Sequence, residues 1–196
     1  MMLFFIFLAA AYTLGSVNVS ILLFRLLGKE DPRTAFSGNA GATNVYRQAG
    51  LFWASAVLLL DMGRAMLIAG AALFILDAPY VTWAGLALVL GNRYPCFHGF
   101  KGGKGVANYL GFTLVLAPGA ALASALAWAA VYQAFRKPFL SSFAMTLLLA
   151  IGTINRFLGT DAMSGGGTGL AVMGSALTAV LIFVNHKENI MQALKS

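Results

Sequence analysis

The segment 3–24, from Leu3 to Phe24, is an apolar run without a single charged side chain. A bilayer core requires about 20 such residues per helix, so this run is long enough to cross a membrane. No basic stretch precedes it, and it is longer than the apolar region of a cleavable signal peptide, which is about 7–15 residues. We therefore expect a retained membrane helix.

The rest of the chain has the same character. Of its 196 residues, 60% are hydrophobic and only 10% are charged, whereas an ordinary soluble domain is about 25% charged. A soluble protein of this size could not bury so much apolar surface. The composition therefore indicates an integral membrane protein, and it excludes a cytosolic enzyme, a nucleic-acid-binding module and a disordered regulator.

Six further apolar segments predict an all-α integral membrane protein with seven transmembrane helices, forming a single domain over residues 1–196. The six segments are 51–76, 81–90, 106–117, 120–135, 139–154 and 169–184. Two of them, 81–90 and 106–117, are short for a membrane span. Both border the glycine-rich stretch 91–105, which we expect to form a loop that dips toward the membrane and lines a cavity, because irregular backbone at membrane depth needs protein or water around it.

The charges predict the orientation of these helices. If the first helix exits into the cytoplasm, the inner loops carry eleven Lys and Arg, whereas the outer loops carry Arg156 alone. Those inner loops are 25–50, 91–105, 136–138 and 185–196. Because cytoplasmic loops are enriched in Lys and Arg, we expect the N-terminus outside and the C-terminus in the cytoplasm. The remaining cation, Arg64, lies within a span three residues after Asp61, and we interpret these two as a structural ion pair.

Two of the inner loops contain candidate phosphate-binding segments. The first consists of Ser37, Gly38, Asn39, Ala40, Gly41, Ala42, Thr43 and Asn44, followed by Arg47. Its small residues allow backbone N–H groups to converge on an anion. Thr43 or Asn44 is a natural N-cap for the next helix, which would place Arg47 in the first turn, where its guanidinium can bind phosphate. The alternative for this segment alone is a plain turn with an arginine reaching toward water.

The second segment contains Lys101, Gly102, Gly103 and Lys104 and ends at Gly105, directly before a helix. It is not a nucleotide P-loop, because the glycine spacing is one residue short and Gly105 stands where Ser or Thr would bind magnesium. The segment is therefore a candidate for binding phosphate but not ATP.

A third segment, at the end of the last span, contains His186 and Asn189. These two are three residues apart and share a helix face. A histidine that merely caps the helix end is the alternative. Ser142, just inside another span, adds a hydroxyl on the same side of the membrane. The sequence has no Cys/His cluster and its carboxylates are scattered, so we expect no metal and no cofactor.

Together these segments resemble the acyl-phosphate-dependent glycerol-3-phosphate acyltransferases, the PlsY family. Ser37 to Asn44 with Arg47 is similar to the first signature of that family. Tyr94-Pro95-x-Phe97, continuing through Phe100 to Ala107, is similar to the second, and His186-x-x-Asn189-Ile190 to the third. Asp31-x-Arg33 also matches. The chain departs from the family pattern at Phe36, where a glycine is usual, at Asn92, where a histidine is usual, and at Arg64, where a lysine is usual.

The resemblance implies that acyl phosphate and glycerol 3-phosphate react to give lysophosphatidic acid and phosphate. We assign catalytic roles to Ser37, Lys104 and His186. Substrate-binding roles are assigned to Gly38, Asn39, Gly41, Ala42, Thr43, Asn44, Arg47, Lys101, Gly102, Gly103, Ser142 and Asn189. In this hypothesis the amides of 38–42 and 102–103, with Lys104, hold the acyl phosphate. Arg47, Asn189 and His186 orient glycerol 3-phosphate.

The resemblance also implies a bacterial inner-membrane location with the site facing the cytoplasm. We expect membrane lipid as a partner, no nucleic acid, and a monomer. A transporter of a phosphorylated solute and a non-catalytic lipid-binding relative are the alternative functions.

Overall fold

The computed structural model describes residues 1–158 and 167–193, and within these ranges it is built of helices without strands. The first pass is divided into α1 (Met2–Ser16) and α2 (Val19–Leu26), followed by a short 3-10 turn, η1 (Pro32–Thr34). The remaining elements are α3 (Ala42–Ile75), η2 (Ala78–Tyr80), α4 (Val81–Arg93), α5 (Val106–Leu116), α6 (Pro118–Phe135), α7 (Pro138–Leu158), α8 (Gly167–Val184) and α9 (Lys187–Ala193). The expected all-α fold is confirmed.

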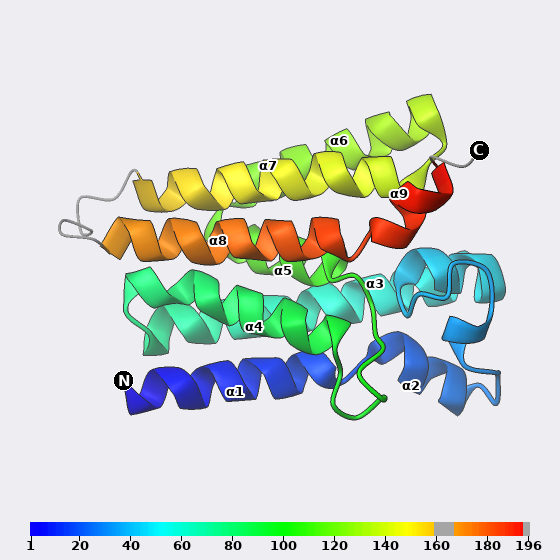
Figure 1. Cartoon of the computed structure of the whole chain (residues 1–196), viewed down its shortest axis with the longest axis horizontal. Helices are drawn as coiled ribbons and strands as arrows, with labels where there is room; N and C mark the ends of the chain where they lie inside the picture. The colour runs from blue at the N-terminus through cyan, green and yellow to red at the C-terminus, as the bar shows by residue number, and fades with distance from the viewer. Residues whose placement is uncertain (159–166, 194–196) are drawn as a thin grey trace.

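The long helices lie side by side, and successive ones run in opposite directions (Figure 1). α4 packs on α1 and α8, while α5 packs on α3, α6 and α7. Among the described residues, four helical segments are long and apolar enough to cross a membrane: Met2–Leu26, Ala42–Ile75, Pro138–Leu158 and Gly167–Val184. With 13 and 11 residues, α4 and α5 are short, as the sequence indicated.

The expected loop start at Gly91 is wrong, because α4 continues to Arg93. Gly91 is buried against α1, where an added Cβ would lie 2.0 Å from the Tyr12 carbonyl oxygen. Gly15 on α1 is equally close to α4, since its Cβ would lie 2.3 Å from the Leu88 oxygen. Membrane helices use small residues in this way to bring their backbones together. The glycine at 91 therefore serves helix packing rather than a turn.

The first pass is not continuous, as the run 3–24 suggested, but breaks at Val17 and Asn18. The Arg64 guanidinium on α3 donates to the carbonyls of Leu14 (3.0 Å) and Gly15 (3.4 Å), and also to that of Val17. Carbonyls freed by a helix break need such a donor inside a membrane. Arg64 therefore supplies the hydrogen-bond donor for the carbonyls at the break between α1 and α2.

Arg64 also forms the ion pair expected from the sequence. Its guanidinium lies 2.8 Å from the Asp61 carboxylate and 2.7 Å from the side-chain oxygen of Asn108 on α5. Both charged side chains are largely buried, at 13% and 9% exposure for Arg64 and Asp61. One side chain thus connects the first pass, α3 and α5.

The helix α3 is interrupted at Gly50, whose φ of 84° lies in the left-handed region. The part after this residue, 51–75, corresponds to the span expected at 51–76. The part before it, 42–49, carries the first candidate phosphate-binding segment into the bundle and positions it next to the α4–α5 loop.

Candidate functional site

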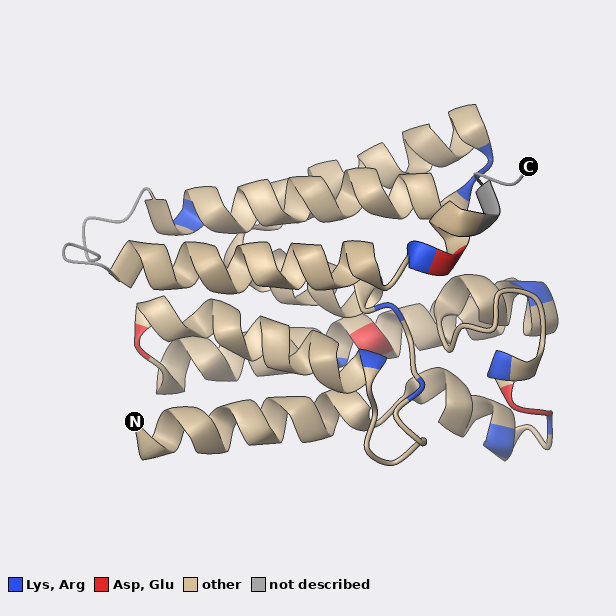
Figure 2. Ribbon diagram, in the orientation of Figure 1, with Lys and Arg blue, Asp and Glu red and all other residues tan. Residues whose placement is uncertain are grey.

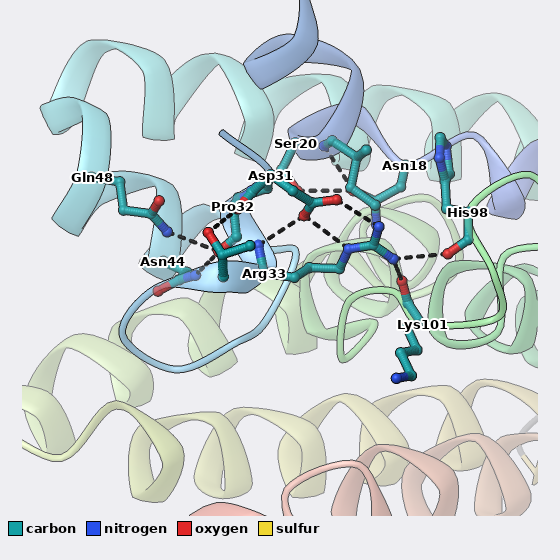
Figure 3. Close-up of polar contacts among 11 residues, drawn as sticks. Asn18, Ser20, Asp31, Pro32, Arg33, Asn44, Gln48, His98 and Lys101 are labelled. Atoms are coloured by element: carbon teal, nitrogen blue, oxygen red, sulfur yellow. Dashed lines mark hydrogen bonds and ion pairs between the residues drawn. The ribbon is translucent and has the colours of Figure 1, made fainter. Parts of the chain in front are cut away.

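Two loops that are distant in the sequence are joined by Arg33. The Asp31 carboxylate accepts hydrogen bonds from the Arg33 backbone N–H and Nε, both at 2.9 Å, and forms an ion pair with the guanidinium at 2.6 Å. The same guanidinium donates to the carbonyls of His98 (2.8 Å) and Lys101 (2.5 Å) in the α4–α5 loop (Figure 3). These bonds hold the first candidate segment against the second, and those from Arg33 lower the pKa of the Asp31 carboxyl.

Asn44 braces the segment 32–37 from inside α3. Its side-chain nitrogen donates to the carbonyls of Pro32 (2.7 Å) and Ala35 (3.2 Å), and its oxygen accepts from the Ser37 N–H (3.3 Å). The residue that caps α3 is Gly41, so the expected cap at Thr43 or Asn44 is wrong. Because the helix starts at Ala42, Arg47 lies in its second turn rather than its first.

A cavity of about 380 Å3, the inner cavity, brings together most of the site residues expected from the sequence. They are Ser37, Asn39, Gly41, Ala42, Thr43, Arg47, Gly103, Lys104, Ser142, His186 and Asn189. These residues come from the segment before α3, from α3 itself, from the α4–α5 loop, from α7 and from the region between α8 and α9. Four expected residues lie outside it: Gly38, Lys101 and Gly102 line a second hollow, and Asn44 is buried beneath the loop.

Lys104 is tied to the end of the bundle on two sides. Its ammonium donates to the side-chain oxygen of Asn189 on α9, and its carbonyl accepts from the Asn185 side chain at 3.2 Å. Burial lowers the pKa of Lys104 to about 8, an effect that the nearby Glu188 carboxylate partly offsets. Lys104 is therefore still mostly protonated at neutral pH.

His186 is buried beside Lys104 and is uncharged at neutral pH. Burial, with the neighbouring ammonium, lowers the pKa of its imidazole to about 4. Nδ1 lies 2.8 Å from the Ile182 carbonyl oxygen, and because that oxygen has no proton to donate, Nδ1 carries the ring hydrogen. The tautomer leaves Nε2 as a hydrogen-bond acceptor.

The backbone N–H groups of Gly102 and Gly103 are already bonded, which corrects their expected role as phosphate donors. They donate to the carbonyls of Arg93 (3.0 Å) and Asn92 (2.9 Å), at the end of α4. An added Cβ would lie 2.0 Å from the Asn92 oxygen at Gly102 and 2.8 Å from the Ala40 oxygen at Gly103. These glycines allow the loop to pack closely rather than bind an anion through their amides.

The free backbone donors lie instead at two helix N-termini that meet at the inner cavity. Among the described residues, the N–H groups of Ala42 and Thr43 on α3, and of Val106 and Ala107 on α5, make no hydrogen bond. All four residues line the inner cavity. A helix N-terminus carries partial positive charge and binds anions through these groups. With Lys104, the two ends give the cavity the kinds of group that bind phosphate.

The hydroxyls differ in what they offer. Ser142 donates its proton to the Pro138 carbonyl at 3.0 Å, so it presents only an acceptor to the cavity. Within the described part of the chain the Ser37 hydroxyl makes no hydrogen bond and remains a donor.

Several residues that line the inner cavity were not predicted from the sequence. Asp61, Asn92 and Asn108 are polar, and the intramembrane position of Asp61 was a signal for a functional environment. The Asn92 side-chain oxygen is buried without a partner in the described residues. The apolar wall contains Leu58, Leu110, Ala125, Trp128, Phe139 and Met145. The cavity thus has a cationic part and an apolar part, as a substrate with a phosphate and an acyl chain would require.

Within residues 1–158 and 167–193, no three metal-ligating side chains gather.

Comparisons with known proteins agree on one family. A family model described as glycerol-3-phosphate acyltransferase matches residues 5–196. A glycerol-3-phosphate acyltransferase of Jannaschia sp. (strain CCS1) is 39% identical over 186 residues, covering 94% of this chain and 86% of the relative. One from Pseudomonas aeruginosa (strain LESB58) is 42% identical over 139 residues, covering 70% and 74%.

Two solved structures share the fold. The crystal structure of PlsY (YgiH), an integral membrane glycerol 3-phosphate acyltransferase, in its glycerol 3-phosphate form is 34% identical with a TM-score of 0.85, covering 98% of this chain and 92% of that chain. The lysophosphatidic acid form of that enzyme has a TM-score of 0.83 at 33% identity, with the same coverage.

Proposed function

The chain belongs to the glycerol-3-phosphate acyltransferase family, and from that premise we propose that it acylates glycerol 3-phosphate with a fatty acyl phosphate as donor. The observation that carries the donor assignment is the meeting of two helix N-termini and Lys104 in a cavity whose other wall is apolar. Such a cavity fits a phosphate joined directly to an acyl chain. The products are then lysophosphatidic acid and inorganic phosphate.

The proposed reaction needs no strong base. The hydroxyl of glycerol 3-phosphate attacks the acyl carbonyl carbon, and the bond from that carbon to the phosphate oxygen breaks. The phosphate leaves with the electron pair and takes the proton of the attacking hydroxyl. Acyl phosphate is a mixed anhydride with a good leaving group, so positioning and charge stabilisation supply most of the rate.

Each residue has a role in this proposal. Lys104, with the amides of α3 and α5, stabilises the phosphate of the donor as its charge develops. Ser37 donates a hydrogen bond nearby. Arg47, Asn189 and neutral His186 orient glycerol 3-phosphate, and the low pKa of His186 fits a hydrogen-bond acceptor better than a proton-abstracting base.

We propose seven membrane spans, with the inner cavity open to the cytoplasm of a bacterial inner membrane. The alternation of helix direction supports this count. Figure 2 shows Lys and Arg concentrated at the end of the bundle that carries the α2–α3 connection, the α4–α5 loop and α9. Such an excess supports a cytoplasmic assignment for that end. A monomer is sufficient in this proposal, because the cavity is lined by residues of a single chain.

The test is phosphate release by the purified protein in lipid nanodiscs. We expect release only when acyl phosphate and glycerol 3-phosphate are both present. Acyl transfer from acyl-CoA would release a thiol instead of phosphate, so lysophosphatidic acid is measured as well, and we expect none when acyl-CoA replaces acyl phosphate. Lys104→Ala should lose nearly all turnover, while Lys29→Ala, which removes an exposed cation outside the cavity, should keep it. Equal turnover in these two variants would remove Lys104 from the mechanism, and lysophosphatidic acid formed from acyl-CoA and glycerol 3-phosphate would refute the donor assignment.

A further inference from the structure

A second hollow of about 530 Å3, the outer hollow, lies beside the inner cavity and takes no part in the reaction described above. It is lined by Asp31, Arg33, Thr34, Gly38, Arg93, Lys101, Gly102 and Glu188. Five of these eight residues are charged, at the cation-rich end of the bundle (Figure 2).

The outer hollow and the inner cavity share their walls. Three chain segments contribute neighbouring residues to both: Gly38 lies between Ser37 and Asn39, Gly102 precedes Gly103, and Glu188 precedes Asn189. Gly38, Gly102 and Glu188 line the outer hollow, and their neighbours in the sequence line the inner cavity. At these three places neighbouring residues of one chain segment line the two spaces.

Some charged side chains of the outer hollow have hydrogen-bond partners and others have none in the described part of the chain. Arg33 is fully engaged, because its guanidinium binds the Asp31 carboxylate and the carbonyls of His98 and Lys101. Figure 3 shows the Lys101 side chain extending away from this network. Lys101 thus contributes its carbonyl to the loop anchor, while its ammonium stays outside that network.

The side chains of Arg93 and Lys101 are the other two cations of the outer hollow. Among the described residues their side-chain nitrogens form no hydrogen bond or ion pair, and the Arg93 Nε is buried without a partner. Arg93 stacks over the Tyr94 ring at 5.4 Å, which holds its guanidinium in place. The carboxylate of Glu188 is the one anion of this lining that is not paired with Arg33. Arg93 and Lys101 outnumber this carboxylate, so the three cations and two anions of the lining leave a net charge of +1, which favours an anion.

We propose that the outer hollow is a binding site for a phosphate monoester dianion, which captures glycerol 3-phosphate before the substrate enters the inner cavity. Arg93 and Lys101 bind the phosphate group, since an arginine fork and a nearby ammonium match its geometry and charge. The identity of the ligand rests on the proposed function. A hollow with excess positive charge beside a site raises the local concentration of an anionic substrate.

The kinetic test compares Lys101→Gln and Arg93→Gln with the matched control Lys29→Gln, at low and high salt. We expect the first two to raise KM for glycerol 3-phosphate by about threefold to tenfold at low ionic strength, with kcat little changed. The difference in KM between these two variants and the control should become smaller at high salt, because ions screen exposed charges. Arg93→Lys should recover most of the loss. Indistinguishable KM values for Lys101→Gln and Lys29→Gln at low salt would overturn the proposal.

A binding test needs no turnover and therefore separates this inference from the proposed function. Inorganic phosphate is titrated onto the Lys104→Gln variant in nanodiscs of purely zwitterionic lipid and followed by phosphorus NMR. Saturable broadening that weakens when Arg93→Gln or Lys101→Gln is combined with Lys104→Gln supports the site even if the enzyme assay fails. Broadening with the same apparent affinity before and after these two substitutions overturns it, because the phosphate then binds elsewhere, such as in the inner cavity. Displacement of phosphate by anionic lipid would assign the hollow to lipid headgroups, which also overturns it.

Discussion

The Lys104 ammonium donates a hydrogen bond to the Asn189 side-chain oxygen across 85 positions of sequence. Lys104 belongs to the α4–α5 loop and Asn189 to α9, so this bond connects two segments that approach the inner cavity from different sides. The ammonium is thereby held in place before any substrate arrives. In a preorganised site of this kind, little reorganisation is needed when charge develops on the leaving phosphate.

Replacement of Asn189 by Ala should release the Lys104 ammonium. A charge-assisted hydrogen bond contributes about 1.5–3 kcal/mol, so kcat/KM should fall by about tenfold to a hundredfold. Phosphate release measured at several glycerol 3-phosphate concentrations gives this ratio. Lys187→Ala, on an exposed residue of the same helix, is the control and should stay close to wild type. A loss as large in the control would mean that α9 is merely unfolded in both.

The activity should decline in alkaline solution. Burial lowers the pKa of Lys104 to about 8, so the proportion of protonated enzyme falls as pH rises through that value. Glycerol 3-phosphate is already doubly ionised there, since a phosphate monoester has its second pKa near about 6. A profile of kcat/KM against pH should therefore bend downward near pH 8.

The variant Lys104→Arg checks the assignment of that pH dependence. A guanidinium keeps its proton throughout the alkaline range, so the downward bend should disappear or move to higher pH, whatever the absolute rate. An unchanged bend in this variant would show that another group titrates. No bend is expected from His186 in this range, because its pKa is lowered to about 4.

Phe36 occupies a backbone position that suits glycine, with a φ of 53°. A side chain in this left-handed region costs about 1–2 kcal/mol, and Phe36 gains little in return because 71% of it is exposed. Phe36→Gly should therefore be more stable than Phe36→Ala by about 1 kcal/mol. Thermal unfolding in detergent measures the difference. At Ala35, whose φ is −127°, a change to glycine should instead destabilise; stabilisation at both positions would point to a general loop effect.

Gly91→Ala tests the contact between α1 and α4. Its new Cβ would meet the Tyr12 carbonyl oxygen at 2.0 Å, so one helix must move, and such overpacking costs about 1–3 kcal/mol. Gly63→Ala is the matched control, since nothing lies within 4 Å of a Cβ on this helical glycine of α3. The control should gain stability, because Ala is the better helix former. Equal melting temperatures for both variants would contradict the close packing.

The features that depend on composition and residue type could be predicted from the sequence. Apolar runs predicted an all-helical membrane protein, and the spacing of Asp61 and Arg64 predicted an ion pair that the structure contains. The residue types near Ser37, Lys104 and His186 indicated phosphate-binding segments, and these do line one cavity. Their catalytic roles stay predictions, as do the seven-span count and the orientation of the termini.

The features that could not be predicted depend on contacts between distant segments. Glycine is a residue typical of loops, and only the proximity of α1 explains why Gly91 lies inside a helix. The sequence suggested that the amides of Gly102 and Gly103 are free to bind phosphate, but both donate hydrogen bonds to carbonyls at the end of α4. The role of Arg33 depends on two carbonyls more than sixty positions away. None of these contacts leaves a pattern in the local sequence.

The donor that Arg64 supplies at the break between α1 and α2 belongs to another helix of the bundle. Carbonyls without a partner are costly in hydrocarbon, so the bent shape of the first pass depends on α3 remaining packed beside it. The geometry of the enzyme's first pass is therefore maintained by a residue that lies 47 to 50 positions further along the chain.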